Sequence, residues 1–158
     1  MQVTIRSITE QDLVSVVALM RDFAEFEGFL DYFEASEQSL QAAMFGPQGF
    51  VEGLIAFDRD KPVAYALFYP NFASFRGERG LYLEDLYISS EYRRHNLGEK
   101  LLREIARVAR SRGLVRIDFL VLDWNMPAVK FYLKHGAEHN EGENHFKFAG
   151  DAFLRLAS

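Results

Sequence analysis

The sequence predicts an α/β domain built on a mixed β-sheet. Three observations support this prediction: long segments with apolar residues at helical spacing, short apolar runs of strand length between them, and turn residues where the two meet. The 158 residues are 49% hydrophobic and 26% charged, which is ordinary for one soluble globular domain. Because no repeat, low-complexity tract or linker interrupts the chain, we expect residues 1–158 to form a single domain.

The chain begins with a strand that is followed by two helices. Val3–Arg6 has the composition of a short strand. Thr9–Asp12 has the form of a helix capping box, and apolar residues at helical spacing continue from Leu13. A second helix is expected from Ser36 to Phe45, because Gly46-Pro47 would end it.

Three strands and an aromatic loop are expected next. The runs Val51–Phe57 and Val63–Phe68 are separated by the turn residues Asp58–Pro62, which predicts a hairpin. The aromatic segment Pro70–Gly80 is expected to be a loop, and Leu81–Ile88 to be a strand.

The second half of the chain alternates between helix and strand. A helix is expected over Gly98–Arg112 and a buried strand over Arg116–Leu122. Met126–His135 should be a helix, with Pro127 in its first turn and a glycine just after its end. The last strands are expected at Asn144–Phe148 and Phe153–Leu156.

Composition excludes several classes of site. Without a cysteine the chain has no disulfide, no cysteine-ligated metal and no cysteine nucleophile. His135 and His139 are four residues apart, but Gly136 separates them and no helical metal motif is present, so we expect no metal. No secretory signal is visible, and the best apolar run, Leu13–Met20, is far below the ~20 residues of a membrane span. We therefore expect a cytoplasmic protein.

Charge is distributed unevenly along the chain. Residues 1–40 hold eight acids and two bases, whereas residues 93–116 hold eight bases and two acids. Such asymmetry favours an anionic partner near the basic segment and a cationic partner near the acidic one. Two solvated helix faces would produce the same pattern.

Arg93-Arg94-His95-Asn96-Leu97-Gly98 joins a predicted strand to a predicted helix. A tight turn into a helix N-terminus exposes unpaired backbone N–H groups and the positive end of the helix dipole, and together these can bind a pyrophosphate. Asn96 suits such a turn because asparagine tolerates left-handed φ. An ordinary helix start is the alternative.

Two further groups of residues could take part in binding or catalysis. Glu84 and Asp85 interrupt an apolar strand, where uncompensated acids are costly. Neighbours on a strand face opposite ways, so only one of them is expected to point into a given cleft. An edge strand with an exposed polar face is the alternative explanation for the two acids. Asn125, Ala128 and Tyr132 are three and four residues apart and should share one helix face.

Together these elements resemble the GCN5-related N-acetyltransferase (GNAT) family, and within it the diamine (spermidine/spermine-type) acetyltransferases. The resemblance covers nearly the whole chain and is most specific from Leu81 to Gly136. The family turn pattern is matched at Arg93 and Gly98, while Asn96 replaces its first glycine. The resemblance implies a twisted mixed sheet with helices on both faces, whose central parallel strands splay to admit the pantetheine arm of acetyl-CoA.

The resemblance also implies residue roles. The acceptor amine would contact Glu27, Glu84 and Asp85. The residues implied for acetyl-CoA are Leu86, Tyr87, Ile88, Arg93, Arg94, His95, Asn96, Leu97, Gly98, Glu99, Asn125, Ala128 and Tyr132. Partners would be acetyl-CoA and a small amine, with neither nucleic acid nor membrane involved, and the protein would be a homodimer.

The implied reaction moves acetyl from acetyl-CoA to a primary amine, such as a diamine, a polyamine or a lysine-like amine. Because no cysteine is present, we expect direct attack by the amine. Glu84 would act as the base, the N–H groups of Leu86 to Ile88 would stabilise the oxyanion, and Tyr132 would protonate the departing thiolate.

Two alternatives stay open. The Asn96 exchange is compatible with a CoA-binding sensor that does not catalyse, and a protein lysine or N-terminal acetyltransferase would use the same fold. In addition, Ser74 and Asn144 stand where the diamine enzymes carry acids. Phe26 stands where those enzymes carry an aromatic residue that has a hydroxyl group. These departures concern polyamine specificity rather than acetyl transfer.

Overall fold

The computed structural model describes residues 2–158, and the chain divides into two compact parts, one ending at Leu120 and the other running from Val121 to Ser158. The first part holds the β-sheet and the second holds two helices. The single domain expected for residues 1–158 stays a prediction.

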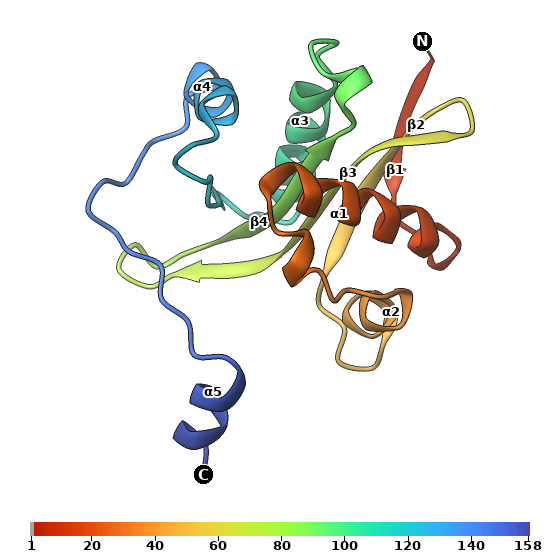
Figure 1. Cartoon of the computed structure of the whole chain (residues 1–158). Coiled ribbons are helices and arrows are strands. Elements are labelled where there is room, and N and C mark those ends of the chain that lie inside the picture. Colours follow the sequence, from red (N-terminus) through yellow and green to blue (C-terminus); the bar gives the residue numbers. More distant parts are fainter. Residues whose placement is uncertain (1) are drawn as a thin grey trace. The chain divides into compact units, whose positions relative to one another are not determined.

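A five-stranded mixed sheet organises the first part, with strand order β1-β2-β3-β4-β5 (Figure 1). Neighbours from β1 to β4 are antiparallel, and β4 and β5 are parallel. The strands are β1 Val3–Ser7, β2 Glu52–Asp58, β3 Lys61–Ala73, β4 Glu78–Ile88 and β5 Ile117–Asp118. The predicted mixed α/β architecture is confirmed.

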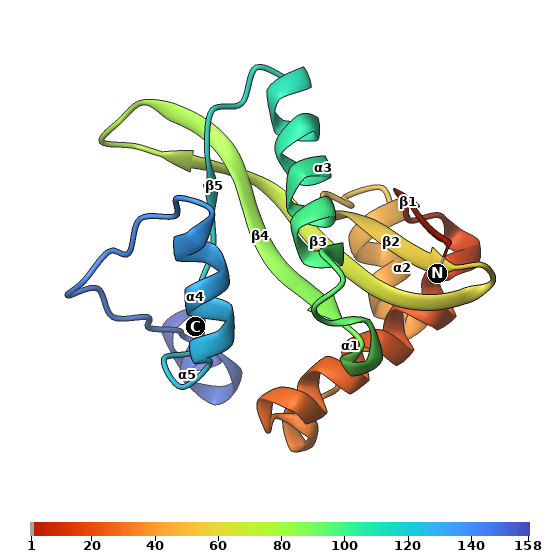
Figure 2. The same ribbon diagram turned by 90° about the horizontal axis from the view of Figure 1, so that it is seen from above.

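Helices lie on both faces of the sheet, as expected (Figure 2). The long amphipathic helix α3, Leu97–Ser111, covers one face, which we call the α3 face. Helices α1, Leu13–Glu27, and α2, Glu37–Phe45, cover the other, which we call the α1 face. Three short 3₁₀ turns complete this part: η1 Glu10–Asp12, η2 Leu30–Tyr32 and η3 Ser90–Tyr92.

The helix starts follow from local chemistry. At Thr9 the predicted capping box is present, with the Asp12 carboxylate accepting from the Thr9 backbone N–H at 2.8 Å. Ser36 caps α2 by accepting from the backbone N–H of Ser39 at 3.1 Å. Helix α1 ends at Gly28, whose φ of 78° provides the left-handed C-cap.

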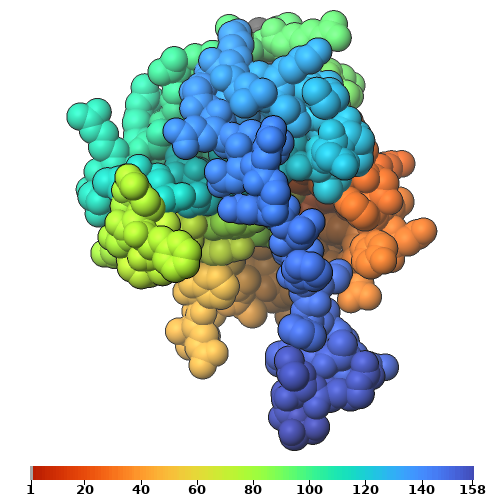
Figure 3. All heavy atoms as spheres, turned by 90° about the vertical axis from the view of Figure 1, so that its left-hand side faces the viewer, coloured from red at the N-terminus to blue at the C-terminus, as the bar shows by residue number. Residues whose placement is uncertain are grey.

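The loop expected at Pro70–Gly80 is wrong. β3 continues to Ala73 and β4 begins at Glu78, so only residues 74–77 form the turn. The turn lies on the surface (yellow-green, Figure 3), and the side chain of its Phe75 is fully exposed. Aromatic residues have high strand propensity, and here they extend the β3–β4 ladder instead of leaving it.

β5 is much shorter than the strand expected at Arg116–Leu122. Only Ile117 and Asp118 pair with β4, opposite Leu81 and Tyr82. Leu120 is 64% exposed, so the apolar run is not a buried strand. Because the pairing stops after Tyr82, the later residues of β4 have no strand partner on the β5 side within residues 2–158, which is the splayed arrangement expected for this fold.

The second part contains the helices α4, Met126–Lys134, and α5, Gly150–Leu156. Helix α4 confirms the helix expected at Met126–His135. The strands expected at Asn144–Phe148 and Phe153–Leu156 are wrong. The first segment alternates polar and apolar residues, but it pairs with no strand of residues 2–158. The second is helical, part of α5, because leucine and arginine are strong helix formers.

Within residues 2–158, no helix has both the length and the apolar character that crossing a bilayer requires.

Candidate active site

A β-bulge in β4 brings two acids to the same face of the sheet. The register with β3 skips Glu84, which therefore has no partner across the ladder. The apolar residues of β4 that pack on the α3 face change parity at this point: they are Leu81, Leu83, Leu86 and Ile88. Glu84 and Asp85 thus both lie on the α1 face and line one pocket.

The expectation that only one of these acids can point into a given cleft is wrong. It assumed a regular strand, in which neighbours alternate, whereas the bulge supplies one extra residue. A signal for it exists in the sequence. The apolar residues from Leu81 to Ile88 are spaced by two, three and two, and a period of two broken once by three is what a single bulge produces.

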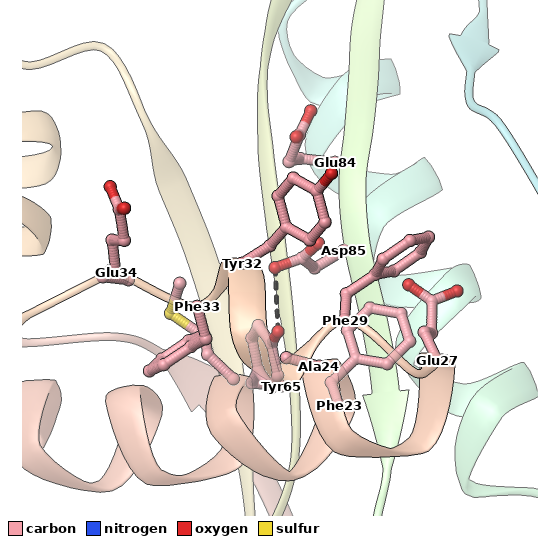
Figure 4. Close-up of a pocket in the computed structure, with 12 residues that line it drawn as sticks. Phe23, Ala24, Glu27, Phe29, Tyr32, Phe33, Glu34, Tyr65, Glu84 and Asp85 are labelled. Carbon is pink, nitrogen blue, oxygen red and sulfur yellow. Dashed lines mark hydrogen bonds between the residues drawn. The ribbon is translucent and has the colours of Figure 1, made fainter.

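The pocket has a volume of about 490 Å³ and belongs entirely to the first part of the chain (Figure 4). Its walls come from α1, the segment after α1, β3 and β4. The twelve lining residues are Met20, Phe23, Ala24, Glu27, Phe29, Tyr32, Phe33, Glu34, Ala35, Tyr65, Glu84 and Asp85. Four of them are acids and none is a lysine or an arginine, so the pocket favours a cation.

Asp85 is the more enclosed of the two β4 acids. It is half-buried, and the hydroxyl of Tyr65 donates a hydrogen bond to its Oδ2 at 2.8 Å (dashed, Figure 4). Burial raises the pKa of Asp85 to about 6; the Tyr65 hydrogen bond opposes this rise, and the charge of Glu84 adds to it. Asp85 therefore titrates close to neutral pH.

Glu84 is exposed and has a tyrosine partner of its own. The hydroxyl of Tyr69 donates to Glu84 Oε2 at 2.8 Å. The Tyr69 ring stacks on Tyr82 with 5.3 Å between centroids and meets the edge of Phe50 at 5.6 Å. Two tyrosines four residues apart on β3 thus each hold one of the two acids of β4.

Glu27, the third acid predicted to contact substrate, lies at the C-terminal end of α1 and lines the same pocket. Burial raises its pKa, and the charge of Asp85 adds to the rise. The structure therefore brings together all three predicted acceptor residues, and a bound ammonium would relieve their mutual repulsion.

The predicted phosphate-binding turn has the backbone geometry of an anion site. Arg94 and Asn96 adopt left-handed φ of 69° and 58°, as expected for Asn96. Within residues 2–158, the backbone N–H groups of Arg94 through Gly98 make no hydrogen bond. Gly98 is buried in the first turn of α3.

Arg93 is engaged within the protein. Its Nε donates to the carbonyl of Ile88 at 3.0 Å, and its guanidinium lies 4.3 Å from the ring centroid of Phe26 and 5.7 Å from that of Tyr87. The side chain therefore ties the turn to the end of β4 and to α1.

The open edge of β4 presents two of the three predicted oxyanion donors. Ser89 donates its backbone N–H to Val63 of β3 at 2.9 Å. N–H groups alternate between the two sides of a strand, so Tyr87 also points toward β3, whereas Leu86 and Ile88 point toward the unpaired edge. Leu86 and Ile88 can therefore donate to a bound group, and Tyr87 cannot.

In the second part, the three residues predicted to share a face belong to α4 and its cap. The side chain of Asn125 accepts from the backbone N–H of Ala128 at 3.3 Å, which makes Asn125 the N-cap. Burial raises the pKa of Tyr132, so its hydroxyl keeps its proton at neutral pH. The ring of Tyr132 meets that of Phe131 edge-on at 5.1 Å.

Metal ligation has no support among residues 2–158, where no group of three or more histidines, aspartates or glutamates could hold an ion.

Comparison with known proteins identifies the family. The model of the acetyltransferase (GNAT) family matches residues 16–137. The chain belongs to this family. It is similar to the thialysine N-epsilon-acetyltransferase of Bos taurus, with 35% identity over 166 residues, covering 98% of this chain and 97% of that protein. It is also similar to the human spermidine/spermine N(1)-acetyltransferase-like protein 1, with 29% identity over 97% of this chain and 23% of that protein.

Among solved structures, an integron cassette protein from the mobile metagenome of V. cholerae superimposes with a TM-score of 0.82 at 25% identity, covering 99% of this chain and 98% of that one. The family match confirms the predicted GNAT fold, and with the named relatives it confirms the predicted enzyme class. The protein is an N-acetyltransferase.

Sequence reasoning missed the tyrosines that hold the acids. Tyr65 was expected only as part of the strand Val63–Phe68, and Tyr69 lay between that strand and the loop expected at Pro70–Gly80. Two phenols at a spacing of four on the strand paired with Glu84 and Asp85 are a usable signal, but only once the pairing of the strands is known.

Proposed function

We propose that this N-acetyltransferase transfers acetyl from acetyl-CoA to the primary amine of a small acceptor with a second positive charge, such as a diamine or a lysine-like amine. The observation that carries the proposal is the pocket beside the β-bulge, with four carboxylates and no cationic side chain among its lining residues. Its volume of about 490 Å³ suits a small molecule. The relatives named for thialysine and for spermidine/spermine support an amine of this kind.

Different segments of the chain would bind different parts of acetyl-CoA. The backbone of the Arg94–Gly98 turn would bind the pyrophosphate, because its N–H groups are free and it opens α3. The edge of β4 beyond Tyr82 would pair with the pantetheine arm, and Leu86 and Ile88 would donate to the acetyl oxygen. Asn125, Ala128 and Tyr132 complete the proposed set. When bound, acetyl-CoA supplies the acetyl group and a thiolate leaving group.

Proton transfer is assigned to two residues. Glu84 would accept the proton of the reacting ammonium, directly or through water, since it is exposed at the pocket and oriented by Tyr69. Tyr132 would return a proton to the departing thiolate, because burial keeps its hydroxyl protonated. A homodimer in the cytoplasm is part of the same proposal, by similarity to the diamine acetyltransferases.

The test compares acceptors that differ in one charge. Turnover of acetyl-CoA is measured at low salt with 1,4-diaminobutane and with butylamine. One carboxylate at a partly desolvated site contributes roughly 1–3 kcal/mol toward a cation, so the diamine should be favoured by about 10–100-fold in kcat/KM. Glu27→Gln should reduce this preference to roughly a tenth of its wild-type value.

Glu25→Gln is the matched control, because Glu25 is an exposed residue of the same helix that does not line the pocket. This variant should retain the full preference. Equal kcat/KM for the two amines with the wild-type protein would contradict a charge-selective pocket and favour a different amine substrate.

A further inference from the structure

Tyr65 is a buried residue whose hydroxyl reaches into the acceptor pocket. Its side chain is 0% exposed and lies on β3 between β2 and β4, where its ring meets that of Tyr87 at 6.3 Å. Burial raises the pKa of Tyr65, so the phenol keeps its proton and acts as the donor to Asp85. The buried position of the ring between β2 and β4 therefore fixes where the Tyr65 hydroxyl lies.

The hydrogen bond uses only one oxygen of Asp85. Oδ2 accepts from Tyr65, and no second hydrogen bond to the carboxylate is present among residues 2–158. An ionised carboxylate has two oxygens and about four acceptor positions, so Oδ1 is left for a ligand. Because Asp85 lines the pocket, that ligand would be a molecule in the pocket (Figure 4).

The groups around Asp85 favour a positively charged ligand. The titratable groups that line the pocket with Asp85 are Tyr65 from β3, Glu84 from β4, Glu27 from α1, and Tyr32 and Glu34 from the segment after α1. These groups include acids and phenols but no base. An ammonium is the group that offers both a positive charge and hydrogen-bond donors to such a site.

The two tyrosine–carboxylate pairs differ in depth. Tyr69 and Glu84 form the exposed pair, and Tyr65 and Asp85 form the enclosed one. An acceptor with two ammonium groups can place one at each acid. Since Glu84 is assigned to the reacting amine, the enclosed acid is left for the other end of the acceptor.

We propose that Tyr65 is a positioning residue that sets acceptor specificity, by fixing Oδ2 of Asp85 so that Oδ1 accepts a hydrogen bond from the second ammonium of the acceptor. The inference rests on the proposed function, and it goes further by naming the residue pair that recognises the second charge.

The pKa of Asp85 provides a second way to test the Tyr65–Asp85 pair. The Tyr65 hydroxyl lowers the pKa of Asp85, against burial and the charge of Glu84, which raise it. Removing the hydroxyl therefore raises this pKa further. The carboxylate then becomes neutral at a higher pH, and the preference for a second ammonium is lost earlier as the pH falls.

The experiment is a double-mutant cycle with Tyr65→Phe, Asp85→Asn and the double variant. The ratio of kcat/KM for 1,4-diaminobutane to that for butylamine is measured from pH 6 to pH 9. Tyr65→Phe should lower the ratio by about 5–10-fold near pH 7, mainly through KM, a loss equal to one charge-assisted hydrogen bond. It should also move the fall of the ratio to higher pH. Adding Tyr65→Phe to Asp85→Asn should change nothing further.

Tyr69→Phe is the matched control, because it removes the same hydroxyl from the pair at Glu84. It should change kcat for both amines and leave the ratio unchanged. The melting temperature of each variant separates positioning from folding, since a purely structural role of Tyr65 would lower stability with no change in the ratio or its pH dependence.

Three results would overturn the inference. If the wild-type protein prefers the diamine and Tyr65→Phe keeps that preference at every pH, the proposed function stands and the role of Tyr65 fails. Effects of Tyr65→Phe and Asp85→Asn that add in the double variant have the same meaning. A wild-type protein without any preference for the diamine overturns both proposals.

Discussion

On the α3 face of the sheet, the buried residues of β2, β3, β4 and α3 are aliphatic except for Phe68, whereas the α1 face buries Tyr65 and Tyr87 and ends in a pocket with four acids. The α3 face is a continuous packed layer that holds the helix whose first turn is the proposed cofactor site. The α1 face is less uniform, because its hydroxyls and carboxylates need partners. The comparison teaches that the α3 face is a packing surface alone, whereas the α1 face combines a packed core with the pocket proposed to select the acceptor, and that a single strand, β4, serves both.

The largest effect is expected from a substitution in the core of the α3 face. Leu101 is 0% exposed in the centre of α3. Leu101→Ala should lower the free energy of unfolding by about 3 kcal/mol through lost burial and a residual cavity, and the melting temperature by roughly 6–12 °C. Thermal and urea unfolding measure this change.

The exposed Leu120 provides a leucine-to-alanine control, which should alter stability by less than about 0.5 kcal/mol. The preference for the diamine over butylamine should be the same in both variants. A changed preference in folded Leu101→Ala protein would mean that the two faces are not separable.

A smaller effect tests polar contacts on the α1 face outside the pocket. Asp12, 6% exposed, accepts hydrogen bonds from Arg6 at 2.6 and 2.8 Å and from Thr9 at 2.8 Å. Asp12→Ala should lower the free energy of unfolding by about 2 kcal/mol at pH 7, because these bonds involve a charged acceptor. Amine selectivity should not change, since Asp12 does not line the pocket.

The pH dependence of this effect has a definite sign. The guanidinium of Arg6 holds the pKa of Asp12 well below its usual range, and the Thr9 hydrogen bonds add to this. A lowered folded-state pKa stabilises the protein fully above the unfolded value of about 4, and the contribution is lost as the pH falls below it. Urea unfolding from pH 7 to pH 3 should show the difference between wild type and Asp12→Ala shrinking below about pH 4. A difference that grows toward acid pH would contradict this assignment.

The smallest effect concerns the start of α3. Asn96 has φ of 58°, a conformation that glycine adopts without strain, so Asn96→Gly should change stability by less than about 1 kcal/mol and keep acetyl-CoA affinity. Asn96→Val should cost about 1–2 kcal/mol, because a β-branched residue is strained in the left-handed region. Calorimetry with acetyl-CoA and thermal unfolding measure both variants. If valine is tolerated as well as glycine, the turn does not require this backbone conformation.

Sequence reasoning was most accurate where the signal is local. The helices α2, α3 and α4 were predicted within one residue of their bounds, because caps, helical spacing and stop glycines act within a few residues. The left-handed turn at Asn96 was predicted from the tolerance of asparagine for that conformation. The acids Glu27, Glu84 and Asp85 were named from the family resemblance, and the structure places all three in one pocket.

Errors occurred where pairing between distant segments decides the structure. The length of the β3–β4 hairpin depends on contacts across the ladder, so its aromatic residues were taken for a loop. Asn144–Phe148 has the alternation of a strand, but a strand also needs a partner. The bulge at Glu84 places Asp85 on the other face of the sheet from the one that regular alternation predicts. The spacing of the apolar residues of β4 indicates this bulge.

The sequence by itself determined the α/β class, the amphipathic α3 with its free N-terminal turn, and the presence of two adjacent acids in an apolar strand. Each of these depends on interactions within a few residues or on composition. Only the tertiary structure decided that both acids share a pocket with Glu27, and that Tyr65 and Tyr69 each hold one of them. The reason is physical: a carboxylate becomes selective through the groups that surround it, and those groups come from β3, α1 and the segment after α1, which only folding brings together.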